Sequence, residues 1–135
     1  MQKITEQKVK GGETLKRWEI VRRRRDLRVI MLCGEKVTGG TLSLYYYNQE
    51  NLRLSHSGVP PRPTRRVAFL LNHRIKGAVI RNRLKRRLRE IFRRNKEWFP
   101  SGFDYVIKVG ANAAELNFHR LAEELHSLAE RIKAC

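Results

Sequence analysis

Residues 78–95 combine two properties that rarely occur together in one helix. From Arg81 to Arg89 the chain holds five arginines and one lysine, and the first acidic residue of the segment is Glu90. Like charges three or four residues apart destabilise a helix by about 0.2–0.5 kcal/mol per pair. Apolar side chains nevertheless recur at helical spacing, at Ile80, Leu84, Leu88, Ile91 and Phe92. This periodicity predicts a helix over about 79–95 with one apolar side that packs against a sheet.

The side of this helix that faces away from Leu84 is almost purely cationic. At 100° per residue it carries Asn82, Lys85, Arg86, Arg89 and Arg93. Solvated helix faces usually mix charge signs, whereas arginine suits phosphate oxygens and stacks on bases. The asparagine adds a donor and an acceptor that a simple charge patch does not need. We interpret this face as a phosphate-binding surface, with a solvated face that has no partner as the alternative.

The net charge of +17 is concentrated in the middle of the chain. Residues 62–96 carry 14 basic residues and 1 acidic residue, whereas residues 97–135 carry 4 basic and 6 acidic residues. This asymmetry indicates a directed binding face for a polyanion rather than general solubility. Nucleic acid is the leading partner class. A membrane surface is less favoured, because the basic helix has no large aromatic anchor apart from Phe92.

Several other kinds of site are not expected. Cys33 and Cys135 lie about a hundred residues apart without metal-binding spacing, which favours a reducing cytoplasm over a disulfide framework. Neither a signal peptide nor a membrane-spanning segment is expected. His119 and His126 are seven residues apart, but surface histidines are far commoner than a metal pair of this kind. No nucleophile and base are paired in the sequence, so no catalytic residue or metal ligand is predicted on the protein.

The apolar patterns elsewhere predict a single domain over residues 14–135, preceded by a flexible basic tail over residues 1–13. The other predicted elements are a helix over 14–32, strands over 41–47, 66–71 and 103–109, and a helix over about 118–133 with Asn117 as its N-cap. The arginine run at 22–25 leaves two interpretations of the first helix, one frayed helix or two short ones. A further short strand near Leu52 and Leu54 is one interpretation of the loop that follows the first strand.

These elements predict an α+β fold in which one sheet packs against helices, in the order helix, three strands, helix, strand, helix. Alternation along the strand over 41–47 divides its side chains between the two faces of the sheet. Leu42, Leu44 and Tyr46 share one face, and Ser43, Tyr45 and Tyr47 share the other.

The segment AVIRNRLKRRLREIFR, residues 78–93, resembles the arginine-rich signature of the protein subunit of bacterial ribonuclease P. The resemblance extends to residues 25–46, 100–109 and 113–128, and covers roughly residues 15–133. It implies a fold of the ribosomal protein S5 domain 2-like type, with a left-handed crossover. It also implies a protein that assists a catalytic RNA, which uses Mg²⁺ to remove the 5′ leader of precursor tRNA.

The resemblance assigns two groups of RNA-binding residues. Those expected to contact the RNA subunit are Arg81, Asn82, Arg83, Lys85, Arg86 and Arg89, to which Arg93 is added. Those expected to line a cleft for the leader, between the first helix and the sheet, are Leu27, Met31, Tyr45 and Arg74. The implied partners are ribonuclease P RNA and precursor tRNA, and no protein partner is indicated.

Two cleft residues depart from the usual family pattern. Leu27 and Met31 stand where the family usually has phenylalanine. An aromatic ring that stacks on a single-stranded base contributes about 1–3 kcal/mol, whereas leucine and methionine pack against a base without stacking. Core packing and leader contact therefore both stay open for these two side chains, and likewise for Tyr45.

Two alternative functions remain on the sequence alone. The first is a non-catalytic protein that binds structured RNA, of the ribosomal or RNA-chaperone type. Such a protein would bind RNA without raising the cleavage of precursor tRNA. The second is a DNA-binding protein that sets the basic helix in a major groove.

Overall fold

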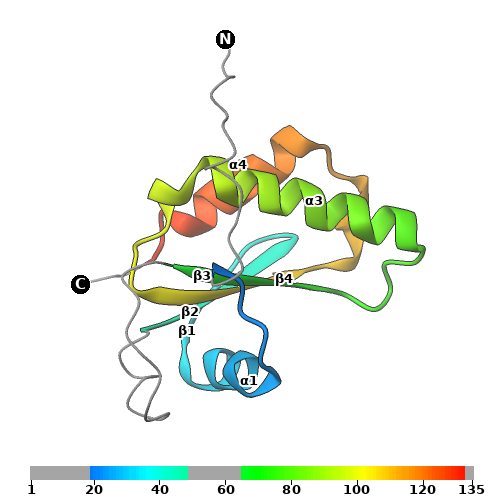
Figure 1. Ribbon diagram of the computed structural model, residues 1–135. Helices are drawn as coiled ribbons and strands as arrows, with labels where there is room; N and C mark the ends of the chain where they lie inside the picture. Colours follow the sequence, from blue (N-terminus) through cyan, green and yellow to red (C-terminus); the bar gives the residue numbers. More distant parts are fainter. Residues whose placement is uncertain (1–18, 49–64, 133–135) are drawn as a thin grey trace.

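A four-stranded mixed sheet forms the middle layer of the protein, with helices on both of its faces (Figure 1). The computed structural model describes residues 19–48 and 65–132. Its elements are α1 (Arg24–Cys33), β1 (Glu35–Thr38), β2 (Leu42–Asn48), β3 (Arg66–Leu71), α3 (Ala78–Arg94), η3 (Lys96–Trp98), β4 (Phe103–Val109), η4 (Ala111–Glu115) and α4 (Phe118–Ala129). The predicted α+β class and the predicted order of helices and strands are confirmed.

The strands lie in the order β1-β2-β4-β3, so β4 is a central strand although it is the last one in the chain. β2 pairs antiparallel with both β1 and β4, whereas β3 pairs parallel with β4. Adjacent parallel strands need a crossover connection, and here that connection contains α3. The left-handed course expected for this crossover stays a prediction.

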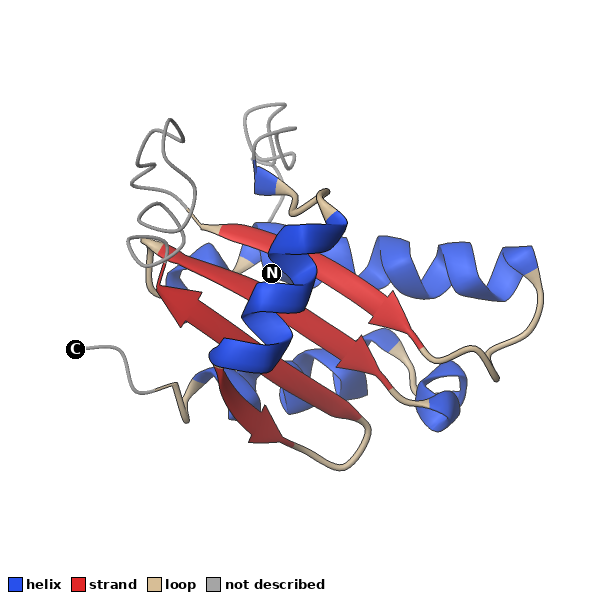
Figure 2. Cartoon of the chain, turned by 90° about the horizontal axis from the view of Figure 1, so that it is seen from below, coloured by secondary structure: helices blue, strands red, loops and turns tan. Residues whose placement is uncertain are grey.

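The two faces of the sheet carry separate apolar clusters, because successive side chains of a strand point to opposite faces. α3 and α4 cover one face and α1 crosses the other (Figures 1 and 2). The larger cluster lies under α3 and α4 and includes Leu42, Leu44 and Tyr46. Tyr45 belongs to the smaller cluster under α1, and Tyr47 packs against it. The predicted division of these apolar and tyrosine side chains of β2 is therefore confirmed.

α3 forms where the apolar periodicity predicted it, within one residue at each end. Its buried side chains are Leu84, Leu88, Ile91 and Phe92. The helix follows Gly77, whose φ of 90° lies in a region that L side chains rarely adopt, so glycine suits this position. Near the other end of the helix, the ring centroids of Phe92 and Phe99 are 4.8 Å apart. Such aromatic pairs stabilise a fold by about 0.5–1.5 kcal/mol beyond the area they bury.

The first predicted helix is only partly correct. α1 begins at Arg24, and the residues before it run beside β3, where Ile20 forms a parallel bridge with Val67. The Val21 N–H donates to the carbonyl oxygen of Val67 at 3.0 Å, so this segment extends the sheet at the edge of β3. In the described part of the predicted helix, residues 19–32, the apolar pattern therefore combines a short extended segment and a helix, and these two structures have different side-chain periods.

One strand was not predicted, one helix ends earlier than predicted, and two predictions lie outside the described residues. β1 was not predicted. It has four residues, of which Val37 alone is buried, so its sequence shows no alternation of apolar and polar side chains. α4 ends at Ala129, before the predicted end near residue 133. The tail over residues 1–13 and the strand near Leu52 and Leu54 lie outside the described residues.

Hydrogen bonds cap the first turn of α4 and join this helix to the hairpin of β1 and β2. The side chain of Asn117 accepts a hydrogen bond from the Arg120 backbone N–H at 2.8 Å, which confirms the predicted N-cap. Oε2 of Glu124 accepts from the backbone N–H groups of Thr41 and Leu42, at 2.5 and 2.6 Å. The last helix thus satisfies one backbone donor in the turn between β1 and β2 and one at the first residue of β2.

Within the described ranges, no helix is both long enough and apolar enough to cross a membrane.

Candidate nucleic-acid interface

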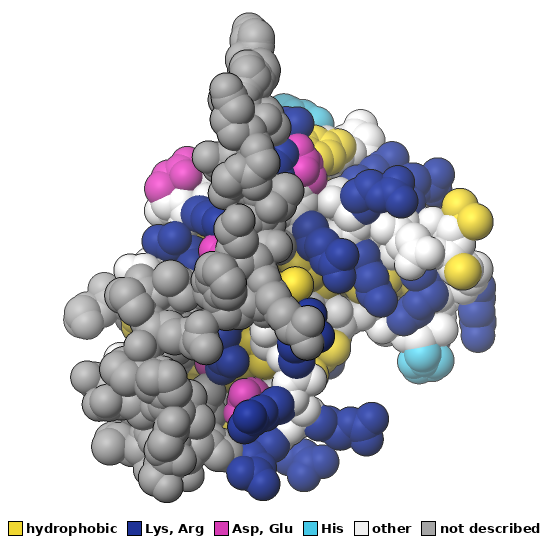
Figure 3. Space-filling model, viewed as in Figure 1, with side chains coloured by type: hydrophobic (Ala, Val, Ile, Leu, Met, Phe, Trp, Pro, Cys, Tyr) yellow, Lys and Arg dark blue, Asp and Glu magenta, His cyan; other side chains and the backbone are white. Residues whose placement is uncertain are grey.

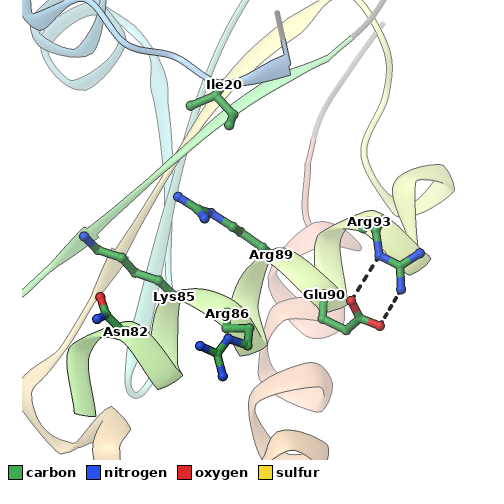
Figure 4. Close-up of a pocket in the computed structure, with 7 residues that line it drawn as sticks. All are labelled: Ile20, Asn82, Lys85, Arg86, Arg89, Glu90 and Arg93. Atoms are coloured by element: carbon green, nitrogen blue, oxygen red, sulfur yellow. Dashed lines mark hydrogen bonds and ion pairs between the residues drawn. The ribbon is translucent and has the colours of Figure 1, made fainter. Parts of the chain in front are cut away.

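The cationic side of α3 borders a groove of about 530 Å³. The groove is lined by Ile20, Asn82, Lys85, Arg86, Arg89, Glu90 and Arg93. In the close-up, the side chain of Arg89 extends from α3 toward Ile20, which forms the opposite wall, and Lys85 points to one side of it (Figure 4). Five of the seven residues predicted to bind the RNA subunit therefore meet in one concave surface, and Ile20 is a wall residue that the sequence did not indicate.

Three cations of this groove have no acidic partner among the described residues. Lys85, Arg86 and Arg89 form none of the ion pairs found in this part of the chain. Arg86 and Arg89 are exposed, and Lys85 is half-buried. Basic side chains crowd this side of the molecule (Figure 3). Since no acidic side chain in ranges 19–48 and 65–132 neutralises these charges, they are available to an anionic partner.

The acid of the groove is already occupied. Glu90 accepts from Nε of Arg93 at 3.0 Å, and a second, short bond joins Nη2 of Arg93 to the other carboxylate oxygen. Nε of Arg94 donates to the same carboxylate at 2.7 Å. The hydrogen bonds from Arg93, with the charges of both arginines, lower the pKa of Glu90. Glu90 therefore stays ionised to a lower pH than an ordinary glutamate does. Its charge neutralises Arg93 rather than Lys85, Arg86 or Arg89.

Arg81 differs from the other predicted RNA-binding residues. Its Nη1 donates to the backbone carbonyl oxygens of Asn72 and Ile75, at 3.1 and 2.8 Å. These carbonyls belong to the loop between β3 and α3, which also carries the exposed Arg74. Its contact with RNA stays a prediction. The geometry gives Arg81 a structural role, in which it ties the loop to the first turn of α3.

Replacement of Arg81 by alanine is expected to lower the free energy of unfolding by about 1–3 kcal/mol, because two backbone carbonyls lose a charged donor. Arg83→Ala is the matched control. It removes the same charge two residues away from an exposed position, and should change stability by less than about 0.5 kcal/mol. Urea denaturation measures both values. Equal effects of the two substitutions would contradict the structural role of Arg81.

Three of the four predicted leader-cleft residues come together between α1 and the sheet. Leu27 and Met31 pack against the cluster that contains Tyr45, whose side chain is 8% exposed. The ammonium group of Lys36 lies 5.4 Å from the centroid of the Tyr45 ring. Arg74 is not part of this cluster. These contacts support core packing for the three side chains, and their contact with a leader stays a prediction.

Arg66 fixes α1 to the sheet, a role that the sequence analysis did not assign. Its Nε and Nη2 donate to the two oxygens of Asp104 at 2.9 and 2.6 Å, and Nη2 lies 3.6 Å from Oδ2 of Asp26 in α1. The hydrogen bond to Asp104 raises the pKa of Arg66. The only signal in the sequence was an aspartate inside the apolar strand FDYVIKV.

A second basic group lies on the side of the sheet opposite α3. It consists of exposed arginines at or just before the start of α1, and one further along it: Arg22, Arg23, Arg24 and Arg28. The space-filling view shows basic side chains gathered near α1, apart from those of α3 (Figure 3). In the sequence this arginine run interrupts the apolar pattern of the first predicted helix, and nothing in that pattern indicates a second basic surface.

A family model described as Ribonuclease P matches residues 15–133 of this chain. The chain belongs to the ribonuclease P protein family. The family resemblance stated from the sequence is therefore confirmed. Membership in the ribonuclease P family implies that the protein is a component of a ribonucleoprotein endoribonuclease, and that it has an RNA partner.

Known proteins of the ribonuclease P family match almost the whole chain. The ribonuclease P protein component of Petrotoga mobilis is 26% identical over 128 residues, which cover 91% of this chain and 98% of that protein. The corresponding protein of Thermotoga sp. strain RQ2 is 31% identical over 125 residues, which cover 90% and 97%.

Solved structures of the ribonuclease P family share the fold. The RNase P protein from Thermotoga maritima matches with a TM-score of 0.70 at 28% identity, and the match covers 86% of this chain and 99% of that chain. The RNase P protein of Staphylococcus aureus matches with a TM-score of 0.70 at 18% identity, covering 83% and 93%. At 18% identity, this second likeness concerns the fold alone.

Proposed function

We propose that the chain is the protein subunit of a bacterial-type ribonuclease P, which removes the 5′ leader of precursor tRNA. The observation that carries this proposal is the row of Lys85, Arg86 and Arg89 beside Asn82 on α3, in a chain that belongs to the family. These side chains would bind the phosphates of the catalytic RNA. The surface beneath α1, with Leu27, Met31 and Tyr45, would receive the single-stranded leader together with Arg74.

The chemistry is assigned to the RNA partner. Cleavage is proposed to depend on Mg²⁺ ions that the RNA holds. Among the described residues there is no group of three or more His, Cys, Asp or Glu side chains that could hold a metal ion, so we derive no step through a metal on the protein. The contribution of the protein is to lower the repulsion between two polyanions and to position the substrate. Since precursor tRNA in bacteria lies in the cytoplasm, we place the complex there.

Reconstitution with a bacterial ribonuclease P RNA tests the proposal. The protein is mixed with the RNA at low Mg²⁺, and leader release from precursor tRNA is followed over time. We expect faster release than with the RNA alone, because the protein offsets charge repulsion that Mg²⁺ no longer screens. A precursor tRNA whose leader is shortened to a single nucleotide is the control that separates assistance through the RNA subunit from assistance through the leader.

Two other outcomes would favour the alternatives. Tight RNA binding without faster leader release would indicate a non-catalytic protein that binds structured RNA. Preferential binding of duplex DNA in a competition with structured RNA would indicate a DNA-binding protein.

A further inference from the structure

We propose that the groove between α3 and Ile20 holds one unpaired nucleotide of the RNA partner, with its base against Ile20 and the neighbouring phosphates on Lys85, Arg86 and Arg89. This inference rests on the proposed function for the identity of the RNA. It adds to that function the kind of RNA element that the α3 surface recognises.

The shape of the groove is the first argument. Its volume of about 530 Å³ lies within the range of about 300–1,000 Å³ that is usual for sites that enclose a small molecule. A convex row of cations is sufficient to bind phosphates, and a hollow with an apolar wall adds nothing to that function. The wall is fixed in place, because Ile20 pairs with Val67 and the neighbouring Val21 is only 4% exposed.

The distribution of polar groups is the second argument. Asn82 is exposed at the edge of the groove and offers both a donor and an acceptor to the edge of a base. The arginine guanidinium group both stacks on a base and binds phosphate. Glu90 is held by Arg93 and Arg94, so this acid does not compete with a phosphate for Arg89. The groove therefore combines an apolar wall, a group that can read a base edge, and cations without acidic partners.

The properties of RNA favour an unpaired nucleotide over a paired one. In an A-form duplex the major groove is too narrow for side chains, and the bases are stacked on one another. Proteins reach the faces and edges of RNA bases mainly in loops, bulges and ends. A base that leaves the stack at such a place can enter the groove while its flanking phosphates stay on the α3 surface.

The test compares two RNA hairpins with the same stem, one fully paired and one with a single-nucleotide bulge. The full-length protein is titrated with each hairpin at one salt concentration, and the bulge is made with each of the four bases. We expect the bulged hairpin to bind about 2- to 12-fold more tightly, which corresponds to one hydrogen bond from Asn82 to the edge of the base, since Ile20 packs against a base without aromatic stacking. Because the Asn82 amide can hydrogen-bond the edge of the base, the four bulged hairpins should also differ in affinity from one another.

Two variants locate the effect, and a third is the matched control. Ile20→Ala should reduce the preference for the bulge, with affinity for the paired hairpin changed by less than about threefold. Asn82→Ala should weaken binding of the bulged hairpin more than binding of the paired hairpin, so that it also reduces the preference. Val79→Ala should leave the preference intact, because Val79 is 77% exposed on α3 and does not line the groove. Asn82 is exposed, so its substitution is not expected to affect folding. Circular dichroism and urea denaturation check each variant.

The outcomes separate this inference from the proposed function. Equal binding of both hairpins by the unmodified protein, or an unchanged preference in both groove variants, overturns the nucleotide site even where leader release is stimulated. A bulge preference that the two groove variants lose, in a protein that does not stimulate leader release, supports the site and overturns the proposed function alone.

Discussion

Simultaneous replacement of Lys85, Arg86 and Arg89 by alanine is expected to weaken binding of ribonuclease P RNA by about a hundredfold or more at low salt. None of the three cations has an acidic partner in the described part of the chain, so all three charges are available to phosphates. Each phosphate that they neutralise releases counterions. Each such contact therefore adds about 0.7–0.9 to the steepness with which the logarithm of the affinity falls with the logarithm of the salt concentration. The slope measured by titration between low and moderate salt should therefore fall by about 2–3.

The matched control removes three charges from the opposite side of the sheet. Arg23→Ala, Arg24→Ala and Arg28→Ala together change the net charge by the same amount, and all three side chains are exposed. With the isolated RNA subunit as the ligand, this variant should keep most of the salt slope. Equal losses for the two triple variants would show that net charge alone, and not the α3 surface, sets the affinity.

Replacement of Arg66 by leucine is expected to lower the free energy of unfolding by about 3–5 kcal/mol. The side chain of Asp104 is 0% exposed, and it would keep its charge in the interior without its bidentate cation. Asp26, which is also buried, would lose the same neighbour. The effect should be constant around neutral pH, because the raised pKa of Arg66 keeps its contribution in place until the pH is strongly alkaline.

Two further variants separate loss of the charge pair from loss of packing. Arg66→Lys keeps a positive charge but cannot form the two parallel bonds, so an intermediate loss is expected. The double variant with Arg66→Leu and Asp104→Leu leaves no charge unpaired between these two positions, and it should recover part of the stability. Urea denaturation at neutral pH measures all three. A loss below about 1 kcal/mol for Arg66→Leu would show that the pair contributes little.

The elements that could be predicted from the sequence are those whose apolar residues repeat with a single period, either helical or alternating. α3 has a long apolar stripe, and β2 alternates between two apolar clusters, so both were located correctly. β1 has a single buried residue. The segment around Ile20 is extended because it pairs with Val67, a partner about fifty positions away in the sequence.

The cationic surface could also be predicted from helical periodicity. The basic residues that have structural roles instead could not, because those roles depend on tertiary contacts. Helical geometry alone placed Lys85, Arg86 and Arg89 on one side of α3. It could not show that Arg81 binds loop carbonyls, because those oxygens belong to a turn whose course depends on β3. The pairing of Arg66 with Asp104 likewise joins two strands that lie far apart in sequence.

The central position of β4 has a consequence for the time at which the protein can fold during its synthesis. The hairpin of β1 and β2 shares no strand pairing with β3 in the described sheet, and only β4 joins them. The 55 residues from Asn48 to Phe103 take about 3–11 s to be made at about 5–20 residues per second. Late in this interval β3 and α3 have been made, while β4, whose Tyr105 ring centroid lies 6.4 Å from that of Phe92 in α3, has not. Translation of β4 is therefore the event that joins two separate pieces into one sheet, and until then the apolar side of α3 must be kept from other chains in the cell.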